Sequence, residues 1–351
     1  MDISKIQSQI DTNRRSVAFD SYDFSVRQLA EMVIEETIDI APEYQRHFAW
    51  SDVRQSQLIE SLILGIPVPS LFMATNKDST WEVIDGLQRL TTLINFISND
   101  NIIKKVNPSC KKLKIAGLEK LDSINGLHFE ELPKSTQLMF MTRPLRVTVL
   151  NDKSDLNLRY DLFERLNTGG IILHPQEIRN CIYLGKFKDF LLKCSLNEHF
   201  KKVVKVPENS SQSGITEELV LKFFAYYENR ELFIHSVKGF LNDYMASKSK
   251  YFKEKDTYEK LFEQTFMLIA ESLPDGIVRS NRKNTTPLIL FEAIAIGVAD
   301  LIHEKSKHRI NYSKLQALLD DEELKKLTTG ATNSRLKLIQ RIEYVKNGII
   351  S

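Results

Sequence analysis

The sequence contains few of the residues that mark specialised protein classes. Its 351 residues include only three cysteines, 13 glycines and 10 prolines. The cysteines, Cys110, Cys181 and Cys194, form no Cys-x-x-Cys pair, so the usual ligand spacing of a structural zinc site is missing. A sparse and odd number of cysteines is typical of a reducing compartment, and we expect a cytoplasmic protein.

A charge excess and a long apolar run are missing as well. The chain has 48 Lys and Arg against 46 Asp and Glu, so it lacks the basic excess of a purely electrostatic nucleic-acid binder. Residues 1–5 show no apolar secretory segment. The most apolar stretch, 287–302, carries Glu292 and Asp300 and is too short to span a bilayer. We therefore expect a buried helix there and no membrane association.

The hydrophobic content of 42% is typical of a globular protein. A length of 351 residues predicts two domains, or one domain with a large helical elaboration. Patterns typical of strands occur only before residue 151, and later segments show helical periodicity alone. The sequence therefore predicts an α+β architecture, with an all-helical second domain. The expected parts are a polar N-terminal segment at 1–24, an α+β domain at 25–170 and a helical domain at 171–351.

Several elements have clear boundary signals. Ser25 and Ser51 are expected to cap helices, the second of which ends at Gly65. Short strands are expected near 38–40, 71–74, 81–84 and 146–150, with further helices at 87–97 and after His174-Pro175. Residues 101–120 hold six lysines and one glutamate, which favours a solvated surface insertion.

The most informative segment is 83–92, which reads as a strand, a glycine turn and a helix start. The first amides of a helix lack intrahelical partners and favour an anion, and Gly86 permits close approach of a phosphate. Arg89 offers a planar fork for phosphate oxygens, and Asp85 is a candidate ligand for hydrated Mg²⁺. Thr91 and Thr92 supply hydroxyls. The alternative is a plain Asp85–Arg89 ion pair at the helix start with two ordinary exposed threonines.

Five motifs in a fixed order resemble the N-terminal domain family of GmrSD restriction endonucleases, a family with the ParB/sulfiredoxin-like fold. They are Tyr44-Gln45-Arg46 with Trp50, Ile59-Glu60-Ser61, Gly65-Ile66-Pro67-Val68-Pro69, Asp85-Gly86-Leu87-Gln88-Arg89, and Phe163–Gly170 followed by Gln176–Asn180. The resemblance implies a small mixed sheet in the first domain. It also implies binding of a nucleoside triphosphate with Mg²⁺, and in some relatives its hydrolysis, within systems that restrict foreign DNA.

The site residues follow from the same resemblance, position by position. Those implied to hold the phosphates are Asp85, Gly86, Gln88 and Arg89, of which Asp85, Gln88 and Arg89 are also the candidate catalytic residues. Those implied beside them are Tyr44, Gln45 and Arg46, and those implied to form a second wall are Asn167, Gly169, Glu177 and Arg179. Glu177 and Arg179 lie two positions apart on a helix, so they face different directions.

The sequence also departs from the family pattern. Leu87 replaces the first glutamine of the Asp-Gly-Gln-Gln-Arg motif, which places hydrolysis in more doubt than binding. No histidine belongs to an HNH-type nuclease arrangement, so we expect a stand-alone member that works with a separate nuclease subunit. Sulfiredoxin chemistry is excluded because Leu87 occupies the position of its reactive cysteine.

These observations predict a nucleotide-binding sensor or regulatory component of a restriction or anti-phage system. Two alternatives stay open. One is a DNA-binding module or nuclease that uses the same cleft for a DNA backbone, with added contacts from 101–120 and from Lys201, Lys202 and Lys205. The other is an adaptor that binds a nucleotide without hydrolysing it. Trp50 is expected either to staple the next helix or to stack on a base, and a homo-oligomer is compatible with the helical half.

Overall fold

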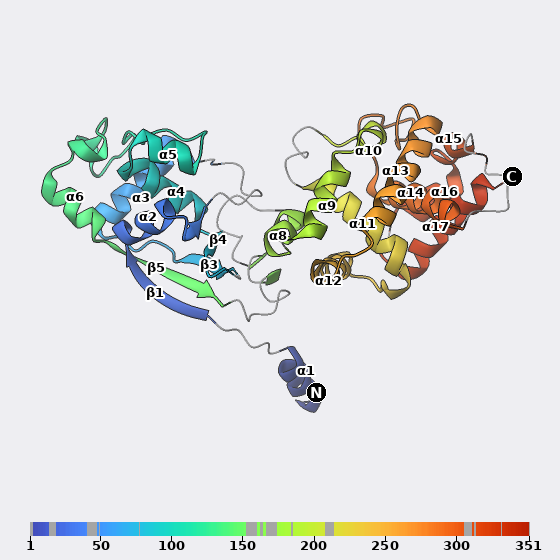
Figure 1. The fold of residues 1–351 in the computed structure, drawn as a ribbon, viewed down its shortest axis with the longest axis horizontal. Coiled ribbons are helices and arrows are strands. Elements are labelled where there is room, and N and C mark those ends of the chain that lie inside the picture. Colours follow the sequence, from blue (N-terminus) through green and yellow to red (C-terminus); the bar gives the residue numbers. More distant parts are fainter. Residues whose placement is uncertain are drawn as a thin grey trace. The chain divides into compact units, whose positions relative to one another are not determined.

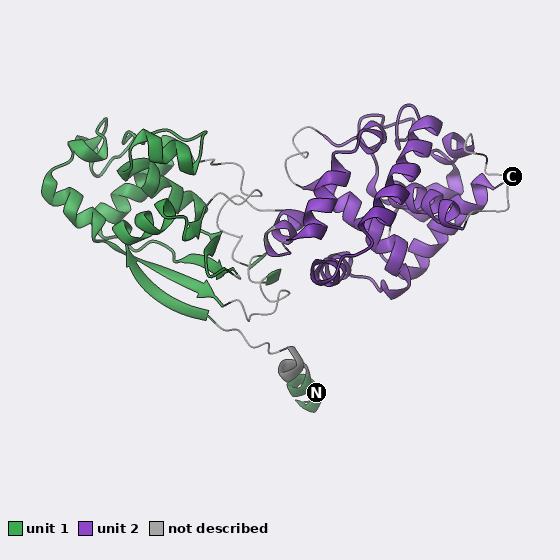
Figure 2. Ribbon diagram, viewed as in Figure 1, with its two compact units in different colours: residues 1–171 green, residues 172–351 purple. Residues whose placement is uncertain are grey.

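The structure of this protein is a computed structural model (Figure 1). It describes residues 3–13, 19–40, 48, 50–76, 78–151, 160–161, 164–165, 174–183, 185–207, 214–304, 311, 314–330 and 332–350. The chain divides into two compact units, unit 1 at residues 1–171 and unit 2 at residues 172–351 (Figure 2). Each unit is described by itself.

Unit 1 is built on a five-stranded mixed sheet. Its strands are β1 (Phe19–Ser25), β2 (Ile38–Asp39), β3 (Leu71–Thr75), β4 (Trp81–Asp85) and β5 (Pro144–Leu150). The spatial order is β1-β5-β3-β4-β2. Neighbours β1/β5 and β3/β4 are antiparallel, whereas β5/β3 and β4/β2 are parallel. The mixed sheet and the four predicted strands are thus confirmed.

Strand β1 corrects the expectation that residues 1–24 form only a polar segment. It pairs with β5 along its whole length, from Phe19 opposite Leu150 to Ser25 opposite Pro144. The rings of Tyr22 and Phe24 lie 5.7 and 5.9 Å from that of Trp81. A second element, α1 (Ile3–Asn13), precedes this strand. The local sequence of β1 is polar, and its partner strand lies more than a hundred residues later, so only tertiary pairing explains it.

The helices of unit 1 lie on one side of this sheet (Figure 1). They are α2 (Val26–Ile34), α3 (Asp52–Leu64), α4 (Leu87–Ile97), α5 (Asp100–Val106) and α6 (Lys134–Met141), with short 3₁₀ turns at Asp122–Ile124 and Phe129–Glu131. The predicted caps are confirmed, since the Ser25 and Ser51 side chains accept hydrogen bonds from the amides of Gln28 and Arg54. Gly65 ends α3 with a left-handed φ of 74°.

The lysine-rich segment 101–120 is not a solvated insertion. Its apolar side chains are buried in the core of unit 1: Ile103, Cys110, Leu113, Ile115 and Leu118. Three of its lysines form ion pairs, with Glu36, Asp52 and Glu130. The expectation rested on lysine content, but the apolar residues between the lysines decide where the segment packs.

The regular elements of the described part of unit 2 are helices, and isolated β-bridges occur at Arg279, Arg282 and Ile350. Its helices are α8 (Pro175–Ile182), α9 (Lys186–Ser195), α10 (Glu198–Val203), α11 (Ile215–Asn229), α12 (Val237–Lys250), α13 (Lys255–Ser272), α14 (Leu288–His303), α15 (Lys314–Leu318), α16 (Glu322–Thr328) and α17 (Arg335–Ile349), with a 3₁₀ turn at Arg230–Leu232. Helix α14 is buried almost all round, as predicted. In the described part of the chain, no helix has both the length and the apolar character to cross a membrane.

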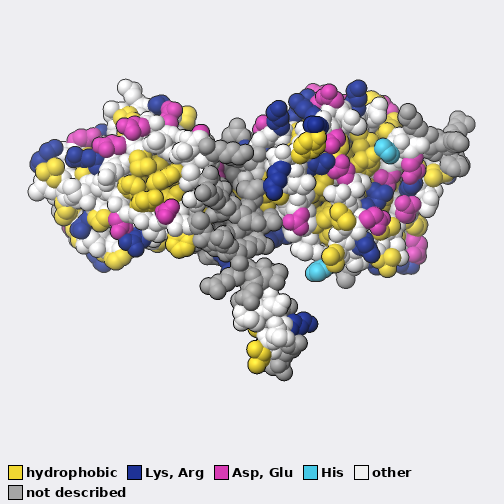
Figure 3. All heavy atoms as spheres, turned by 60° about the horizontal axis from the view of Figure 1, so that its bottom comes forward, with side chains coloured by type: hydrophobic (Ala, Val, Ile, Leu, Met, Phe, Trp, Pro, Cys, Tyr) yellow, Lys and Arg dark blue, Asp and Glu magenta, His cyan; other side chains and the backbone are white. Residues whose placement is uncertain are grey.

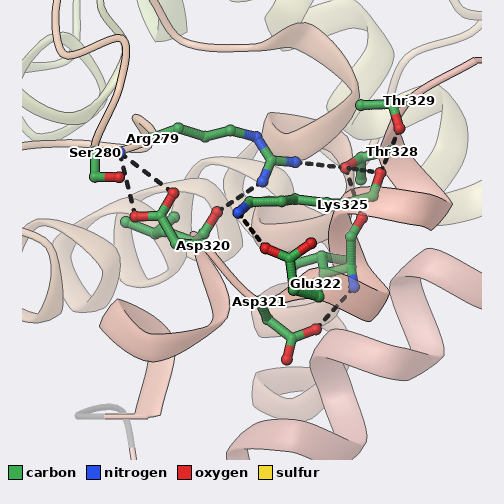
Figure 4. A network of polar contacts seen from close by, with 10 residues as sticks. Arg279, Ser280, Asp320, Asp321, Glu322, Lys325, Thr328 and Thr329 are labelled. Atoms are coloured by element: carbon green, nitrogen blue, oxygen red, sulfur yellow. Dashed lines mark hydrogen bonds and ion pairs between the residues drawn. The ribbon is translucent and has the colours of Figure 1, made fainter.

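A polar network fixes the end of unit 2 that contains α16 (Figure 4). The Arg279 guanidinium donates to the Leu319 carbonyl at 3.0 Å and to the Thr328 hydroxyl at 2.7 Å. Asp321 accepts from the Leu324 amide at 2.8 Å and so caps α16. Because the described groups of this network satisfy one another, we assign it to fold stability.

Candidate functional site

The strand-turn-helix of the sequence is present at the junction of β4 and α4. Strand β4 ends at Asp85, Gly86 has a φ of 106°, and α4 begins at Leu87. A Cβ atom at Gly86 would lie 2.3 Å from the Leu71 Cδ2 atom. The position therefore requires glycine both for its backbone conformation and for space. Gly86 also provides no side chain to cap the first amides of α4.

Arg89 joins three parts of this junction. Its Nη2 atom lies 2.5 Å from Asp85 Oδ2, and its Nη1 atom donates to the Ser70 carbonyl at 3.1 Å and to the Pro69 carbonyl. The Arg89 side chain is only 13% exposed, compared with 39% for Asp85. The ion pair considered from the sequence is therefore present. Arg89 holds the Gly65–Pro69 turn against the start of α4, and no described residue is within hydrogen-bonding distance of its Nε–H group.

Gln88 connects the same helix start to the segment that precedes α3. Its Oε1 atom accepts a hydrogen bond from the Trp50 amide at 3.2 Å. The Trp50 carbonyl accepts from Gln55 Nε2 at 3.2 Å, and Gln55 Oε1 accepts from Asn95 at 3.2 Å. The Arg54 guanidinium lies 5.0 Å from the centroid of the Trp50 ring. Trp50 is therefore anchored through its backbone, and its partly buried ring packs on the core of unit 1.

Thr91 and Thr92 do not lie at the surface of the turn. Both are buried, and the Thr92 hydroxyl donates to the Gln88 carbonyl at 2.7 Å. They belong to the stretch of α4 from Leu90 to Phe96 in which every residue is buried. The sequence spacing predicted that these hydroxyls contact a phosphate, but in the structure both side chains are buried in the core. We therefore leave both threonines out of the site.

The expected flanking residues fall into two groups. Tyr44, Gln45, Arg46, Asn167 and Gly169 lie outside the described residues. Glu177 and Arg179 belong to unit 2, where Glu177 accepts from the His174 amide at 2.6 Å and so caps α8.

Arg179 is a core residue of unit 2 and is only 1% exposed. It donates to Gln176 at 3.0 Å, to Asn242 at 2.8 Å and to Glu218 at 3.0 Å. These partners come from α8, α12 and α11, so Arg179 holds three helices together. That Arg179 forms part of a second wall of the nucleotide site stays a prediction, and its burial makes it the less accessible of the pair Glu177 and Arg179.

Arg179 is one end of a chain of buried charges that the sequence did not reveal. Glu218 also lies 3.4 Å from Lys222, Lys222 lies 3.8 Å from Glu292, and Glu292 lies 2.5 Å from Arg341. Burial alone would raise the pKa of Glu218, but Lys222 and Arg179 outweigh it and leave the pKa below its usual value. The only local signal was the Glu218–Lys222 spacing of four residues.

Comparisons with known proteins agree with the motif order. The model of the family described as GmrSD restriction endonuclease, N-terminal domain, matches residues 29–184, a range that contains all five motifs. No curated protein and no solved structure matches the chain. Residues 29–184 are thus similar to the N-terminal domain of GmrSD restriction endonucleases.

Proposed function

We propose that the protein is a nucleotide-binding component of a restriction system and that the nucleotide phosphates lie at the start of α4. The observation that carries this proposal is the convergence of three family motifs on one turn. Gln88 binds the Trp50 amide, and Arg89 binds both Asp85 and the carbonyls of Pro69 and Ser70. Side chains of the turn itself thus bind backbone groups of two distant segments and hold the glycine turn in place, as a preorganised anion site requires.

The residues at this turn divide between binding and positioning. Gly86 has no side chain to cap the first amides of α4, and these amides together with the Nε–H side of Arg89 would bind the phosphates. Gln88 would position the segment that ends at Trp50. Both Gln88 and Arg89 are already engaged with the protein, and this supports binding more than turnover.

Asp85 fits a magnesium ion only as one ligand among several. Its Oδ2 atom is taken by Arg89, and its carboxylate is partly exposed. Among the described residues there is no group of three or more His, Cys, Asp or Glu side chains that could hold a metal. Mg²⁺ commonly binds through one carboxylate, water and substrate phosphates. Asp85 would therefore supply one ligand to a magnesium ion that is bound together with the nucleotide. The ion would neutralise part of the phosphate charge.

The test is thermal unfolding of the protein with ATP, GTP, CTP or UTP and magnesium. A nucleotide at about a hundredfold its Kd adds ~2.7 kcal/mol to the free energy of unfolding. For a unit of this size the midpoint should rise by ~5–11 °C. We expect Arg89→Lys to reduce the shift, because lysine keeps the charge but loses the planar fork.

The matched control is Arg146→Lys, which changes an exposed ion pair with Asp23 at the β1/β5 edge. The control should keep the full nucleotide shift. If no nucleotide raises the midpoint, or if both variants lose it equally, the phosphate site at α4 is wrong. Leu87→Gln then tests turnover, since it restores the family glutamine. Phosphate release by that variant alone would identify Leu87 as the cause of an inactive wild-type site.

A further inference from the structure

A hollow in unit 2 is lined by side chains of the kinds that bind phosphate, and it is separate from the turn at Gly86. It has a volume of about 250 Å³ and lies where α12 ends and α9 begins. Its lining contains four lysines, Lys186, Lys248, Lys250 and Lys253, with Ser249 and three aromatic rings. No acidic residue belongs to this lining. Over the face shown in Figure 3, basic and acidic side chains are interspersed.

The lysines differ in their partners. Lys248 is fixed in the wall, because its Nζ atom lies 2.9 Å from Glu228 and 2.8 Å from the Tyr258 hydroxyl. Lys186, Lys250 and Lys253 are exposed and form no ion pair with any described residue. Lysines in the last turn of α12 complement its dipole, but Lys186 and Lys253 lie outside that helix. Glu254, whose Oε2 atom lies 3.8 Å from Lys248 Nζ, compensates part of this positive charge. The ammonium groups of Lys186, Lys250 and Lys253 around one hollow still favour an anion.

Two further groups point to a bound phosphate. The Ser249 hydroxyl lines the hollow and is buried without a hydrogen-bond partner among the described residues. Such an orphaned group calls for a ligand or water. Lys186 is the first residue of α9, a ten-residue helix whose cap, Gly185, offers no side chain to its first amides. That helix start adds partial positive charge at the lysines.

The aromatic rings indicate that the ligand also contains a flat ring, such as a nucleobase. Phe252 is fixed in the core, with its ring 4.9 Å from Phe187 and 5.1 Å from Phe190. Tyr251 is instead 58% exposed, and the Lys253 ammonium lies 4.7 Å from its ring centroid. An exposed ring beside unpaired lysines is the usual platform for a nucleobase.

We propose that this hollow binds a nucleoside phosphate, either free or as one unit of a single strand. The lysines, the Ser249 hydroxyl and the start of α9 hold the phosphate. Tyr251 stacks on the base. This site lies wholly within unit 2 and does not depend on nucleotide binding at α4.

The test is fluorescence anisotropy of the full chain with a labelled oligothymidylate of about ten nucleotides at about 50 mM salt. Lys250→Ala/Lys253→Ala should weaken binding by about 10–100-fold. It should also reduce the slope of log K against log salt by about 0.7 per lysine. Tyr251→Ala should weaken binding by about tenfold, and Lys186→Ala gives an independent variant of the same wall.

The matched control is Lys283→Ala/Lys326→Ala, which removes the same charge from two exposed positions of the same unit. It should leave the affinity unchanged, and circular dichroism verifies folding of each variant. Absence of binding, or equal losses in the pocket and control variants, would overturn the proposal. Competition with thymidine monophosphate distinguishes a free nucleotide from a strand as the source. The nucleoside assignment would be overturned if inorganic phosphate competed as well as thymidine monophosphate and Tyr251→Ala bound the oligonucleotide with unchanged affinity.

Discussion

The two units use polar side chains in opposite ways. In unit 1, Gln88 and Arg89 hold backbone segments around a partly exposed turn. In unit 2, three cations and two carboxylates form a chain of ion pairs inside the helical core, from Arg179 to Arg341. The comparison teaches that residues from the five motifs do not share one task. Asp85–Arg89 shapes a partly exposed turn, whereas Arg179 fixes helix packing.

The largest effect is expected from breaking the buried pair of unit 2. Arg341→Met leaves Glu292, only 2% exposed, with Lys222 at 3.8 Å as its remaining cation. Loss of one partner of such a pair costs ~3–5 kcal/mol of unfolding free energy, because the other charge stays buried. Chemical denaturation measures this change.

The control on the same helix is Lys346→Met, whose partner Glu304 is half exposed. Such a pair contributes ~0–1 kcal/mol. The double variant Glu292→Leu/Arg341→Met should recover much of the loss. A double variant no more stable than Arg341→Met would show that packing, not charge, dominates at this position.

The next largest effect is expected at the turn of unit 1. Gly86→Ala forces a residue with a Cβ atom to a φ of 106° and into overlap with Leu71. The backbone strain alone costs ~1–3 kcal/mol, and the overlap adds to it. Gly126→Ala is the matched control, because Gly126 also has a positive φ but only Lys114 Cε, at 4.0 Å, near the added atom. If urea denaturation shows the same loss of unfolding free energy for Gly86→Ala and Gly126→Ala, the close approach of Leu71 to Gly86 has no energetic effect, contrary to this prediction.

A smaller effect is the dependence of the unfolding free energy on pH, which Glu218 contributes in unit 2. The lowered pKa of Glu218 means that the folded state favours its carboxylate, so its stabilisation is present above the ordinary value near 4.5. That contribution is lost as the pH falls through the lower, folded-state pKa. Glu218→Gln should cost ~1–3 kcal/mol at pH 7, and the difference from wild type should shrink in acid. A difference that stays constant from pH 7 to acid would refute a charged role.

The smallest effect concerns two buried thiols, Cys110 in unit 1 and Cys194 in unit 2. Burial raises the pKa of the Cys194 thiol to about 12, and burial also raises the pKa of Cys110. Both should react slowly with a thiol reagent at neutral pH until the protein unfolds, because the thiolate is the reactive form. Labelling followed by peptide mass spectrometry measures each site separately. Rapid labelling of Cys194 in folded protein would show that unit 2 opens locally.

Local sequence signals predicted elements whose causes lie within a few residues. Ser25 and Ser51 cap helices, and Gly65 and Gly86 take left-handed conformations that the neighbouring residues require. Strand β1 could not be predicted, because its stability comes from pairing with β5. The segment 101–120 was misjudged for the same reason, since burial of Leu113 and Ile115 depends on the rest of the core.

The sequence by itself determined the motif order, the α+β and helical halves, and the glycine turn between a strand and a helix. These features depend on periodicity, caps and backbone freedom, which act over short distances. Only the tertiary structure decided which polar side chains meet. It placed Thr92 and Arg179 in cores, joined Gln88 to Trp50, and connected Glu292 to Arg341 across 49 positions. Such pairs depend on how helices and strands pack, and no local pattern specifies them.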